Sequence, residues 1–260
     1  QFGRIATLSS VPMARRKSLA FLDVGQGDCF VADTKSGAII FDGGSSSEDQ
    51  VGRYRILPYM KYLGYQKIQI AVISHMDIDH YSGIRELLEM GKIKYLGLPE
   101  IPKDETMKKI IGIAKKRGTT IFYLSRGRQI TTKDGSLKVL HPQKNSQMEK
   151  NAASLVMQGK ILGYRVLLTG DVEKEGEEEL LSEELERADI LKAAHHGSKN
   201  STSNEFLQKV QPKQTVISCG KQNRYGHPHL ETIHRLQTYH TKIYRTDRSG
   251  AIIFFKRRDG

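Results

Sequence analysis

Short apolar runs separated by polar turns recur along the whole chain. Runs of three to six such residues predict β-strands. In the first half of the sequence they cover residues 18–23, 28–32, 38–41 and 68–73. In the second half they cover residues 154–157, 164–168, 190–194, 215–218, 242–244 and 251–255. Because each half supplies several strands, the pattern favours two packed sheets.

Longer stretches with helical spacing lie between these strands. They cover residues 56–63, 83–90, 105–117 and 173–187. In the second stretch Ile84, Leu87 and Leu88 share one face, as in a helix that packs on a sheet. The last stretch is strongly acidic, and a solvated face is expected from Glu177, Glu178, Glu179, Glu183, Glu184 and Glu186. We expect an α+β protein with its helices outside the sheets, in a single domain covering residues 1–260 with a core at about 18–256 and an N-terminal extension at 1–17.

The composition adds a positive charge to this picture. The chain has 41 Lys and Arg against 29 Asp and Glu, which gives a net charge of +12. A basic surface favours polyanions such as nucleic acid, phosphorylated metabolites or anionic lipid. The alternative is a lysine-rich surface that serves solubility alone.

Three negative observations narrow the class. Cys29 and Cys219 lack metal-ligand spacing and are expected to be small buried residues. No run approaches the roughly 18 apolar residues of a membrane span, so the chain itself is expected to be soluble. The start, Gln1-Phe2-Gly3-Arg4, has no initiator Met and no signal-peptide pattern, which predicts a piece of a longer protein.

The segment Ser74-His75-Met76-Asp77-Ile78-Asp79-His80 directly follows the apolar strand at 68–73. Two imidazoles and two carboxylates, those of His75, Asp77, Asp79 and His80, therefore leave one strand end together. Four ionisable groups crowded in this way are costly unless something compensates their charge. A bound divalent metal is such a compensation, and the segment indicates a metal-dependent hydrolase.

Further polar residues lie directly after or before other predicted strands. They are Asp42, Asn151, Ser154, Asp171, His195 and His196. Taken alone, an Asp after a strand is typically a helix N-cap, and a His pair can be an ordinary structural element. Loops at strand ends are where rigid scaffolds carry their sites, so the recurrence of the pattern indicates one shared site.

Several short motifs follow one another in a fixed order. They are Asp23-Val24-Gly25-Gln26-Gly27-Asp28, Ser74-His75-x-Asp77-x-Asp79-His80, Leu167-Leu168-Thr169-Gly170-Asp171, His195-His196-Gly197-Ser198, Asn223-Arg224-Tyr225-Gly226-His227-Pro228 and Tyr244-Arg245-Thr246-Asp247. The His and Asp motif, with Asp42, Asp171 and His196, resembles the metallo-β-lactamase superfamily. The combined motifs, over roughly residues 18–256, resemble the C-terminal metallo-β-lactamase-like domain of the ComEC family of DNA-uptake channels.

This resemblance implies both a fold and a biological setting. The fold is an αββα sandwich of two packed mixed β-sheets, with helices outside and a metal site at one edge. The setting is natural competence, in which the domain is expected to degrade the DNA strand that does not enter the cell. The remainder of the protein is expected to form a membrane channel, with this domain on the extracytoplasmic side of a bacterial membrane.

The ligands depart from the usual superfamily signature, His-x-His-x-Asp-His. Asp77 stands at the second His, and before the strand at 154–157 the nearest candidate for a further His is Asn151. Oxygen-rich sites suit Mn²⁺ or Mg²⁺ better than Zn²⁺. We expect two divalent ions, manganese in preference to zinc or magnesium, and no small-molecule cofactor.

The resemblance distributes the ligands over two ions. One ion is expected on His75, Asp77 and Asn151, and the other on Asp79, His80 and His196, with Asp171 between them. The choice between His195 and His196 stays open, although the His-Gly pairing of the superfamily favours His196. Asp42 and Ser154 are expected to support the ligands, Asp42 as the hydrogen-bond acceptor that orients an imidazole.

Two metal ions can generate a hydroxide and stabilise the attacking and leaving oxygens of a phosphodiester. The catalytic candidates are Asp79, His195 and His227, the last as a phosphate ligand or a proton donor. The candidates for substrate binding are Ser198, Lys199, Asn223, Arg224 and Tyr225.

Three functions are compatible with these residues. The first is a nuclease acting on DNA, the second is a hydrolase of a small substrate, and the third is a non-catalytic DNA-handling module. The net charge and the absence of Trp argue against an apolar small-molecule pocket. The presence of Asp77, Asp79, His80 and Asp171 argues against a decayed site, so the nuclease is the expected function.

Overall fold

The computed structural model describes residues 16–148, 150–183 and 185–256. The expected N-terminal extension lies, apart from its last two residues, outside the described residues. The strands are β1 (Ser18–Phe21), β2 (Phe30–Thr34), β3 (Gly37–Phe41), β4 (Ile68–Val72), β5 (Ile93–Pro99), β6 (Thr120–Leu124), β7 (Gln129–Thr132), β8 (Gly135–His141), β9 (Val156–Ile161), β10 (Tyr164–Leu168), β11 (Ile190–Lys192), β12 (Gln214–Ile217), β13 (Lys242–Arg245) and β14 (Ile252–Phe255). The helices are the π-helix η1 (Gly52–Ile56), α1 (Leu57–Tyr62), α2 (Ile78–Glu89), α3 (Glu105–Lys116), the 3₁₀ turn η2 (Lys150–Ala153), α4 (Lys174–Leu181), the 3₁₀ turn η3 (Ala194–Gly197), α5 (Asn204–Val210), α6 (Leu230–Thr238) and α7 (Thr246–Ser249).

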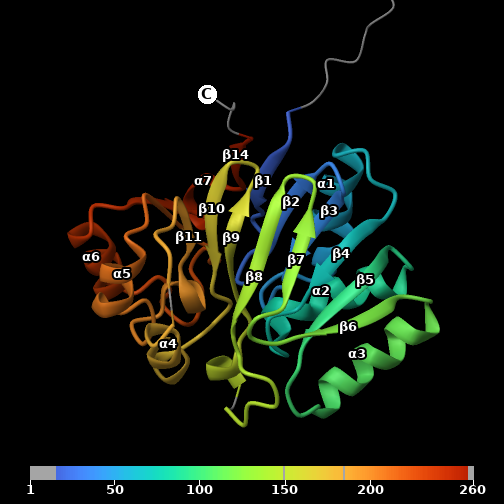
Figure 1. The fold of residues 1–260 in the computed structure, drawn as a ribbon. Helices are drawn as coiled ribbons and strands as arrows, with labels where there is room; N and C mark the ends of the chain where they lie inside the picture. The colour runs from blue at the N-terminus through green and yellow to red at the C-terminus, as the bar shows by residue number, and fades with distance from the viewer. Residues whose placement is uncertain (1–15, 149, 184, 257–260) are drawn as a thin grey trace, which may run out of the picture.

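The strands form two seven-stranded sheets (Figure 1). The order is β14-β1-β2-β3-β4-β5-β6 in the first sheet and β13-β12-β11-β10-β9-β8-β7 in the second. Each sheet mixes parallel and antiparallel pairs. A shared apolar cluster joins side chains of both sheets, among them Phe21, Phe30 and Leu168. The predicted pair of packed mixed sheets is confirmed.

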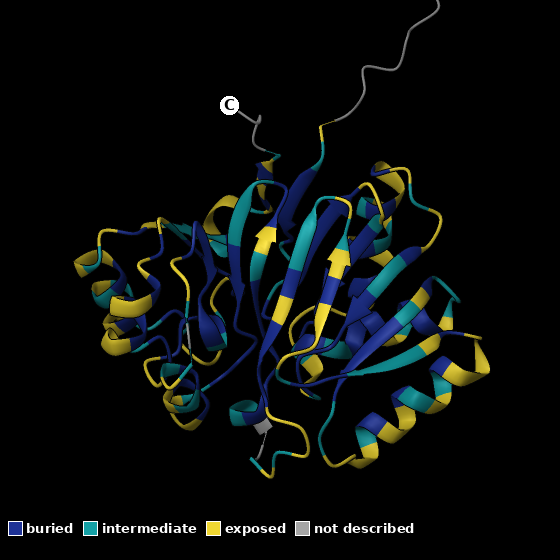
Figure 2. Ribbon diagram, viewed as in Figure 1, coloured by how far each residue is buried: buried dark blue, intermediate teal, exposed yellow. Residues whose placement is uncertain are grey.

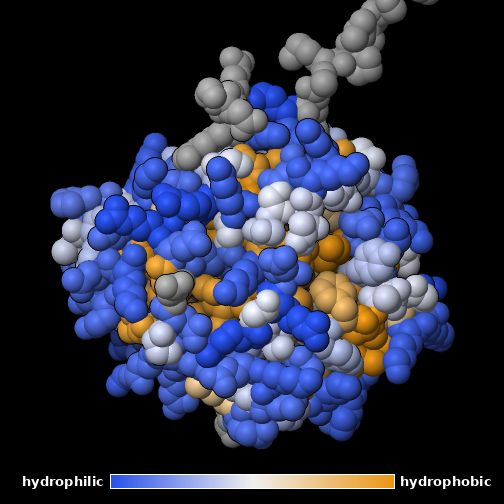
Figure 3. Space-filling view, in the orientation of Figure 1, coloured by the Kyte–Doolittle hydropathy of each residue, from blue (hydrophilic) through white to orange (hydrophobic). Residues whose placement is uncertain are grey.

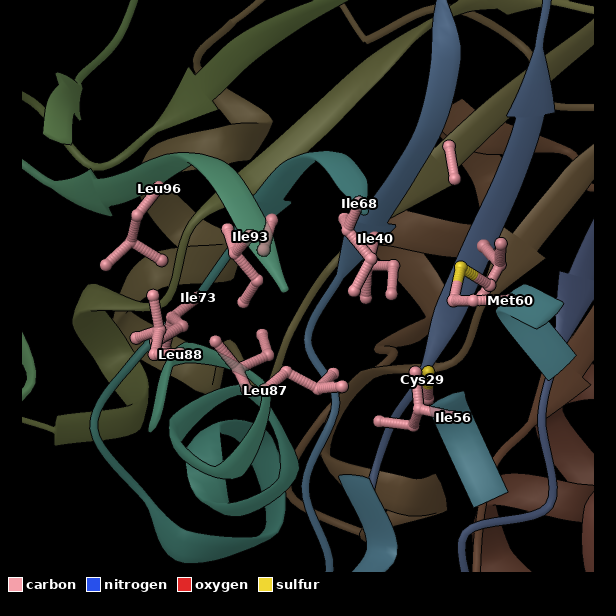
Figure 4. Packing of buried hydrophobic residues seen from close by; sticks show 14 of the residues in the cluster. Cys29, Ile40, Ile56, Met60, Ile68, Ile73, Leu87, Leu88, Ile93 and Leu96 are labelled. Carbon is pink, nitrogen blue, oxygen red and sulfur yellow. The ribbon is translucent and has the colours of Figure 1, made fainter. Parts of the chain in front are cut away.

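Helices cover the outer faces of both sheets. Ile84, Leu87 and Leu88 of α2 are buried as predicted and belong to one apolar cluster with the first sheet. Figure 4 shows Leu87 and Leu88 beside Ile73, which follows β4, and Ile93 of β5. Burying each of these side chains contributes roughly 1.5–3 kcal/mol relative to leaving it exposed. Helix α3 buries one face and exposes the other, as Figure 2 shows. On the second sheet, α4, α5 and α6 form the corresponding layer.

The acidic helix is shorter and less solvated than the sequence predicted. It ends at Leu181, and Glu177 is buried (2% exposed), whereas Glu178 is exposed as expected. The Glu177 carboxylate accepts hydrogen bonds from the backbone amides of Thr202 and Ser203. Buried amides of a loop need acceptors, and this demand overrides the tendency of a glutamate to face water.

One edge of the two sheets collects most of the polar strand ends. The pair β3 and β4 is parallel, as are β10, β11 and β12, so the carboxyl ends of these strands lie together. Strand β2 is antiparallel to β3, and its first residue, Phe30, pairs with Phe41, the last residue of β3. The beginning of β2 therefore lies at the same edge as the end of β3.

The opposite edge holds both ends of the described chain. Ser18 pairs with Phe255, and the amide of Lys256 donates to the carbonyl of Lys17 at 2.7 Å (Figure 1). Among the described residues no helix is long and apolar enough to cross a membrane. Hydrophilic residues cover most of the face in Figure 3, with hydrophobic ones in narrow strips between them. Both cysteines are buried, as predicted.

Candidate metal centre

The loop after β4 and the first turn of α2 carry the His and Asp motif. Asp77 is the N-cap residue of α2, and Asp79 lies in its first turn. Gly44 lets this turn approach closely, because a Cβ atom at Gly44 would lie 2.5 Å from the carbonyl oxygen of Ile78. The amide of Gly43 also donates to the carbonyl of His80. The loop after β3 therefore fixes the helix end that presents the ligands.

Asp42 is the acceptor around which this loop is organised. Its fully buried carboxylate accepts from the amide of Ser74 (2.7 Å), from the Ser74 hydroxyl (2.8 Å) and from Nδ1 of His80 (2.9 Å). Its φ of 59° lies in the left-handed region, which is uncommon for a residue other than glycine. A carboxylate in this position holds the His80 ring in one orientation.

Three buried imidazoles have Nδ1 tied to an acceptor in the same way. Nδ1 of His80 donates to Asp42, and Nδ1 of His196 lies 2.9 Å from the carbonyl oxygen of Ser218. Nδ1 of His75 lies 3.0 Å from the Ser74 hydroxyl, which itself donates to Asp42. Because Nδ1 carries the hydrogen in each case, Nε2 is the nitrogen left to bind a cation.

The three Nε2 atoms lie near carboxylate oxygens, that of His75 at 3.7 Å from Oδ2 of Asp77. Nε2 of His80 is 3.1 Å from Oδ2 of Asp171, and Nε2 of His196 is 3.3 Å from Oδ2 of Asp79, without hydrogen-bond geometry. Within the described residues none of these Nε2 atoms, nor that of His75, has a hydrogen-bond partner. Four groups of three residues could each hold a metal ion, because one ligand atom of each residue lies within 4.8 Å of the other two. They are His75, His80 and Asp171; Asp79, His80 and His196; Asp28, Asp171 and His196; and Asp28, Asp42 and His80. Imidazole nitrogens that lack hydrogen-bond partners and lie beside carboxylate oxygens fit divalent metal ions.

The electrostatics of the cluster agree with this fit. Burial alone would raise the pKa of Asp171, yet the charges of His196 and His80 hold it well below its usual range. Burial alone would lower the pKa of His80, yet Asp171 and Asp42 raise it well above its usual value. Burial likewise opposes the ionisation of Asp79, but its interaction with His196 and the charge of His80 lower its pKa to about 2. Positive charge is therefore strongly favoured between these carboxylates, and cations that replace the protons satisfy the same demand.

His195 and His196 occupy different places despite being neighbours. Both have left-handed backbone, with φ of 47° and 52°, so their side chains diverge. His196 is buried in the cluster, whereas His195 is partly exposed and its Nδ1 pairs with Oε1 of Glu173 at 2.7 Å. His195 belongs to none of the metal-capable groups among the described residues.

His227 lies beside this pair from the loop after β12. Its ring centroid is 5.3 Å from that of His195 and 6.2 Å from that of His196. Burial, together with the neighbouring histidines, lowers the pKa of His227 to about 4. Tyr225 stacks on His227 at 5.7 Å, with 21° between the ring planes.

These residues line a pocket of about 250 Å³. Its walls are Gln26, Ser46, Asp77, Ile78, Asp79, Asp171, His195, His196, Tyr225 and His227. Ile78 and Tyr225 are partly exposed, at 51% and 43%. The volume of the pocket is below the usual range of sites that enclose a drug-sized molecule.

Other predicted residues lie around this pocket rather than in it. Ser198 is buried, and its hydroxyl accepts from the amide of Asn200. Lys199 lines a larger cavity of about 690 Å³ between α4 and α5, which contains none of the clustered imidazoles. The Asn223 side chain makes four hydrogen bonds within its own loop. Arg224 is exposed and places its guanidinium over the Tyr225 ring at 4.9 Å.

Asn151 and Ser154 flank the entry to β9. The Ser154 hydroxyl accepts from the amide of Asp171 at 3.3 Å, which supports the residue between the imidazoles. The carbonyl of Asn151 accepts from the amide of Ser154. The side-chain oxygen of Asn151 is buried and has no hydrogen-bond partner in the described parts of the chain.

Sequence reasoning missed three charged residues of the site. Asp28 precedes β2, Lys192 is the last residue of β11, and Glu173 contacts His195. A signal existed for two of them, because Asp28 belongs to a quoted motif and Lys192 interrupts an apolar strand. Both lie within predicted strands, at residues 28–32 and 190–194, and neither directly follows one.

Residues 22–221 match the model of the Metallo-beta-lactamase superfamily, and the chain belongs to this superfamily. The chain is similar to ComE operon protein 3 of Bacillus subtilis (strain 168), with 37% identity over 259 residues, and to Competence protein ComA of Neisseria gonorrhoeae, with 30% identity over 248. Each match covers 92% of this chain but 33% and 32% of those proteins, so the chain spans about a third of their length. The resemblance to competence proteins is confirmed.

A solved structure with the same fold is the metallo-beta-lactamase fold protein YhfI from Bacillus subtilis. It matches with a TM-score of 0.60 over 91% of this chain and 99% of that chain. The sequence identity is 13%, so this likeness supports the fold alone.

Proposed function

We propose that this chain is a metal-dependent nuclease domain that hydrolyses DNA phosphodiester bonds with two Mn²⁺ ions. The observation that carries the proposal is the convergence of three bare Nε2 atoms, from His75, His80 and His196, on the carboxylates of Asp79 and Asp171. The carboxylate and amide oxygens among the proposed ligands favour manganese over zinc.

The proposed ligands divide as the motif suggests. His75, Asp77 and Asn151 would hold one ion. Asp79, His80 and His196 would hold the other, with Asp171 between them. His196 is preferred to His195 because its Nε2 faces the carboxylates.

When bound, the two ions would supply an activated water and stabilise negative charge on the phosphate. His195, oriented by Glu173, would donate a proton to the leaving oxygen at the pocket wall. With a pKa of about 4, His227 is neutral at pH 7, so it would hydrogen-bond the phosphate rather than act as an acid.

Several features favour a polymer as the substrate. The net charge of +12 favours a polyanion, and the small open pocket favours a chain that passes across it. The exposed ring of Tyr225 offers a surface on which an unpaired base can stack, beside the guanidinium of Arg224. Asn223 would shape this loop, and Ser198 and Lys199 would border the path of the strand.

The relatives suggest the biological setting. Because they are competence proteins about three times as long as this chain, we propose that it acts as one domain of a DNA-uptake protein with a membrane channel. Its task there would be to degrade the strand that is not transported, on the extracytoplasmic side.

Incubating DNA with the protein and Mn²⁺ tests the proposal. Cleavage is expected, with complete loss in a chelator and a loss of about a hundredfold or more in Asp79→Ala. Asp49→Ala, which changes an exposed aspartate elsewhere, should cleave as the wild type does. Retention of DNA without cleavage would point to a DNA-handling module, and intact unbound DNA to a small-substrate hydrolase; either result overturns the nuclease.

A further inference from the structure

Lys192 places a buried ammonium group directly behind the metal centre. The residue is 4% exposed and ends β11. Its Nζ donates to the carbonyl of Gly170 at 2.9 Å and to Oδ1 of Asp171 at 3.4 Å, and it forms a closer ion pair with Oδ2 of Asp28. Three acceptors therefore match the three N–H bonds of the ammonium.

The two oxygens of Asp171 are divided between different partners. Oδ1 faces Lys192, whereas Oδ2 lies 3.1 Å from Nε2 of His80 and 3.4 Å from Nε2 of His196. A carboxylate with one oxygen held by an ammonium group presents a single oxygen to the imidazole cluster. Lys192 also holds the carbonyl of Gly170, so both the backbone and the side chain of the loop are fixed.

Asp28 lies within reach of the cluster but has a charge partner of its own. Its Oδ1 is 3.6 Å from Nδ1 of His196, and that nitrogen already donates to the Ser218 carbonyl. Its Oδ2 pairs with Lys192. A buried carboxylate without a partner is costly, and Lys192 removes that cost without a metal ion.

The charges of the centre support this division. Five aspartates surround it: Asp28, Asp42, Asp77, Asp79 and Asp171. One ammonium group and two divalent cations would balance five negative charges. Without Lys192, two divalent cations would carry one charge fewer than these five carboxylates, of which all but Asp77 are largely buried.

We propose that Lys192 is a positioning residue of the metal centre: it holds Oδ1 of Asp171, so that Oδ2 alone serves the metal ions, while Asp28 balances Lys192 and binds no metal. The inference rests on the two metal ions of the proposed function. It does not depend on DNA being the substrate.

Titration with Mn²⁺ followed by electron paramagnetic resonance tests this role without any measurement of activity. The wild type should bind two ions that give an exchange-coupled signal. The double variant Asp28→Asn/Lys192→Met removes both charges together, so the loss of one partner does not unfold the site. We expect its weaker Mn²⁺ site to lose at least about tenfold in affinity and its coupled signal to change, because Oδ1 of Asp171 is released.

The single variant Asp28→Asn should keep two coupled ions, because an amide oxygen still accepts from Lys192. Lys213→Met is the control for loss of a lysine–aspartate pair, since Lys213 pairs with Oδ1 of Asp189 at 3.0 Å at the opposite end of the β11 and β12 pair. Circular dichroism confirms that each variant is folded. A folded double variant with wild-type affinity and an unchanged coupled signal overturns the proposal, as does loss of one ion in Asp28→Asn. A wild type that binds no Mn²⁺ pair would instead refute the metal centre itself.

Discussion

Replacing Asp42 by Asn tests whether hydrogen bonds behind the ligands set the metal affinity. The wild-type carboxylate serves three donors: the amide and the hydroxyl of Ser74, and Nδ1 of His80. An amide has one acceptor oxygen, and its NH₂ group must face at least one of these donors. The change therefore removes hydrogen bonds from a fully buried site while keeping the volume of the side chain.

The magnitude has a structural part and a metal part. Each donor left unsatisfied costs about 1–3 kcal/mol of stability. If the NH₂ group faces His80, Nδ1 becomes an acceptor and the hydrogen moves to Nε2, where it blocks metal binding. Loss of such an orienting partner typically lowers metal affinity 10- to 100-fold, which corresponds to about 1.4–2.7 kcal/mol.

Calorimetric titration with Mn²⁺ measures the metal part, and thermal unfolding in a chelator measures the structural part. Asp33→Asn is the matched control, because Asp33 is equally buried in the same sheet and accepts from Lys17 and Tyr65 far from the histidines. It should lose stability and keep its Mn²⁺ affinity. If folded Asp42→Asn binds Mn²⁺ with an affinity within about threefold of that of the control, then Asp42 does not set the metal affinity by keeping the hydrogen on Nδ1 of His80.

Three further changes test other parts of the structure. In Gly44→Ala the new Cβ meets the carbonyl of Ile78, which should lower the free energy of unfolding by about 1–3 kcal/mol and weaken Mn²⁺ binding. The control is Gly112→Ala, which has open space around its Cβ and should neither lower the free energy of unfolding nor weaken Mn²⁺ binding. Burial raises the pKa of Glu177 above its ordinary value of 4.5, so the contribution of Glu177 to stability is fully present below that value and falls as the pH rises through the folded-state pKa. The stability of the wild type relative to Glu177→Gln, measured by urea titration, should therefore decline with rising pH. A difference in stability that stays constant with pH contradicts the raised pKa. Tyr225→Ala should raise KM for single-stranded DNA about 5- to 150-fold through lost stacking without changing Mn²⁺ affinity, and equal KM values for it and for the exposed control Tyr62→Ala would exclude a stacking role.

The sequence was sufficient for the sheets and for most of the clustered residues, for a geometric reason. His75, Asp79, Asp171 and His196 all follow strands that run parallel to a neighbour. The carboxyl ends of parallel strands meet at one edge, so residues that share this position in the sequence also share a place in the fold. A pattern of strand followed by ligand is therefore legible without coordinates.

Asp28, one of the residues that escaped prediction, reaches the same edge by another route. Asp28 precedes β2, and it reaches the site because β2 runs antiparallel to β3. Strand direction is a property of the pairing and is not visible in one apolar run. Glu177 was misassigned for a related reason, since the amides that it caps belong to a loop 25 residues away.

The division between His195 and His196 depends on the backbone rather than on side-chain chemistry. Both residues have positive φ and both line the pocket, but only the His196 imidazole enters the buried cluster, whereas that of His195 pairs with Glu173. Non-glycine residues adopt such conformations at a cost of order 1–3 kcal/mol each, which the surrounding contacts must offset. The contacts are specific: the amide of His195 donates to Gly170, Nδ1 of His196 donates to Ser218, and Lys192 fixes Gly170 from behind. The strained His195 and His196 backbone and the buried Lys192 are thus linked. The carbonyl of Gly170 accepts from both the His195 amide and the Lys192 ammonium group, and Gly170 directly precedes Asp171, which faces the imidazoles.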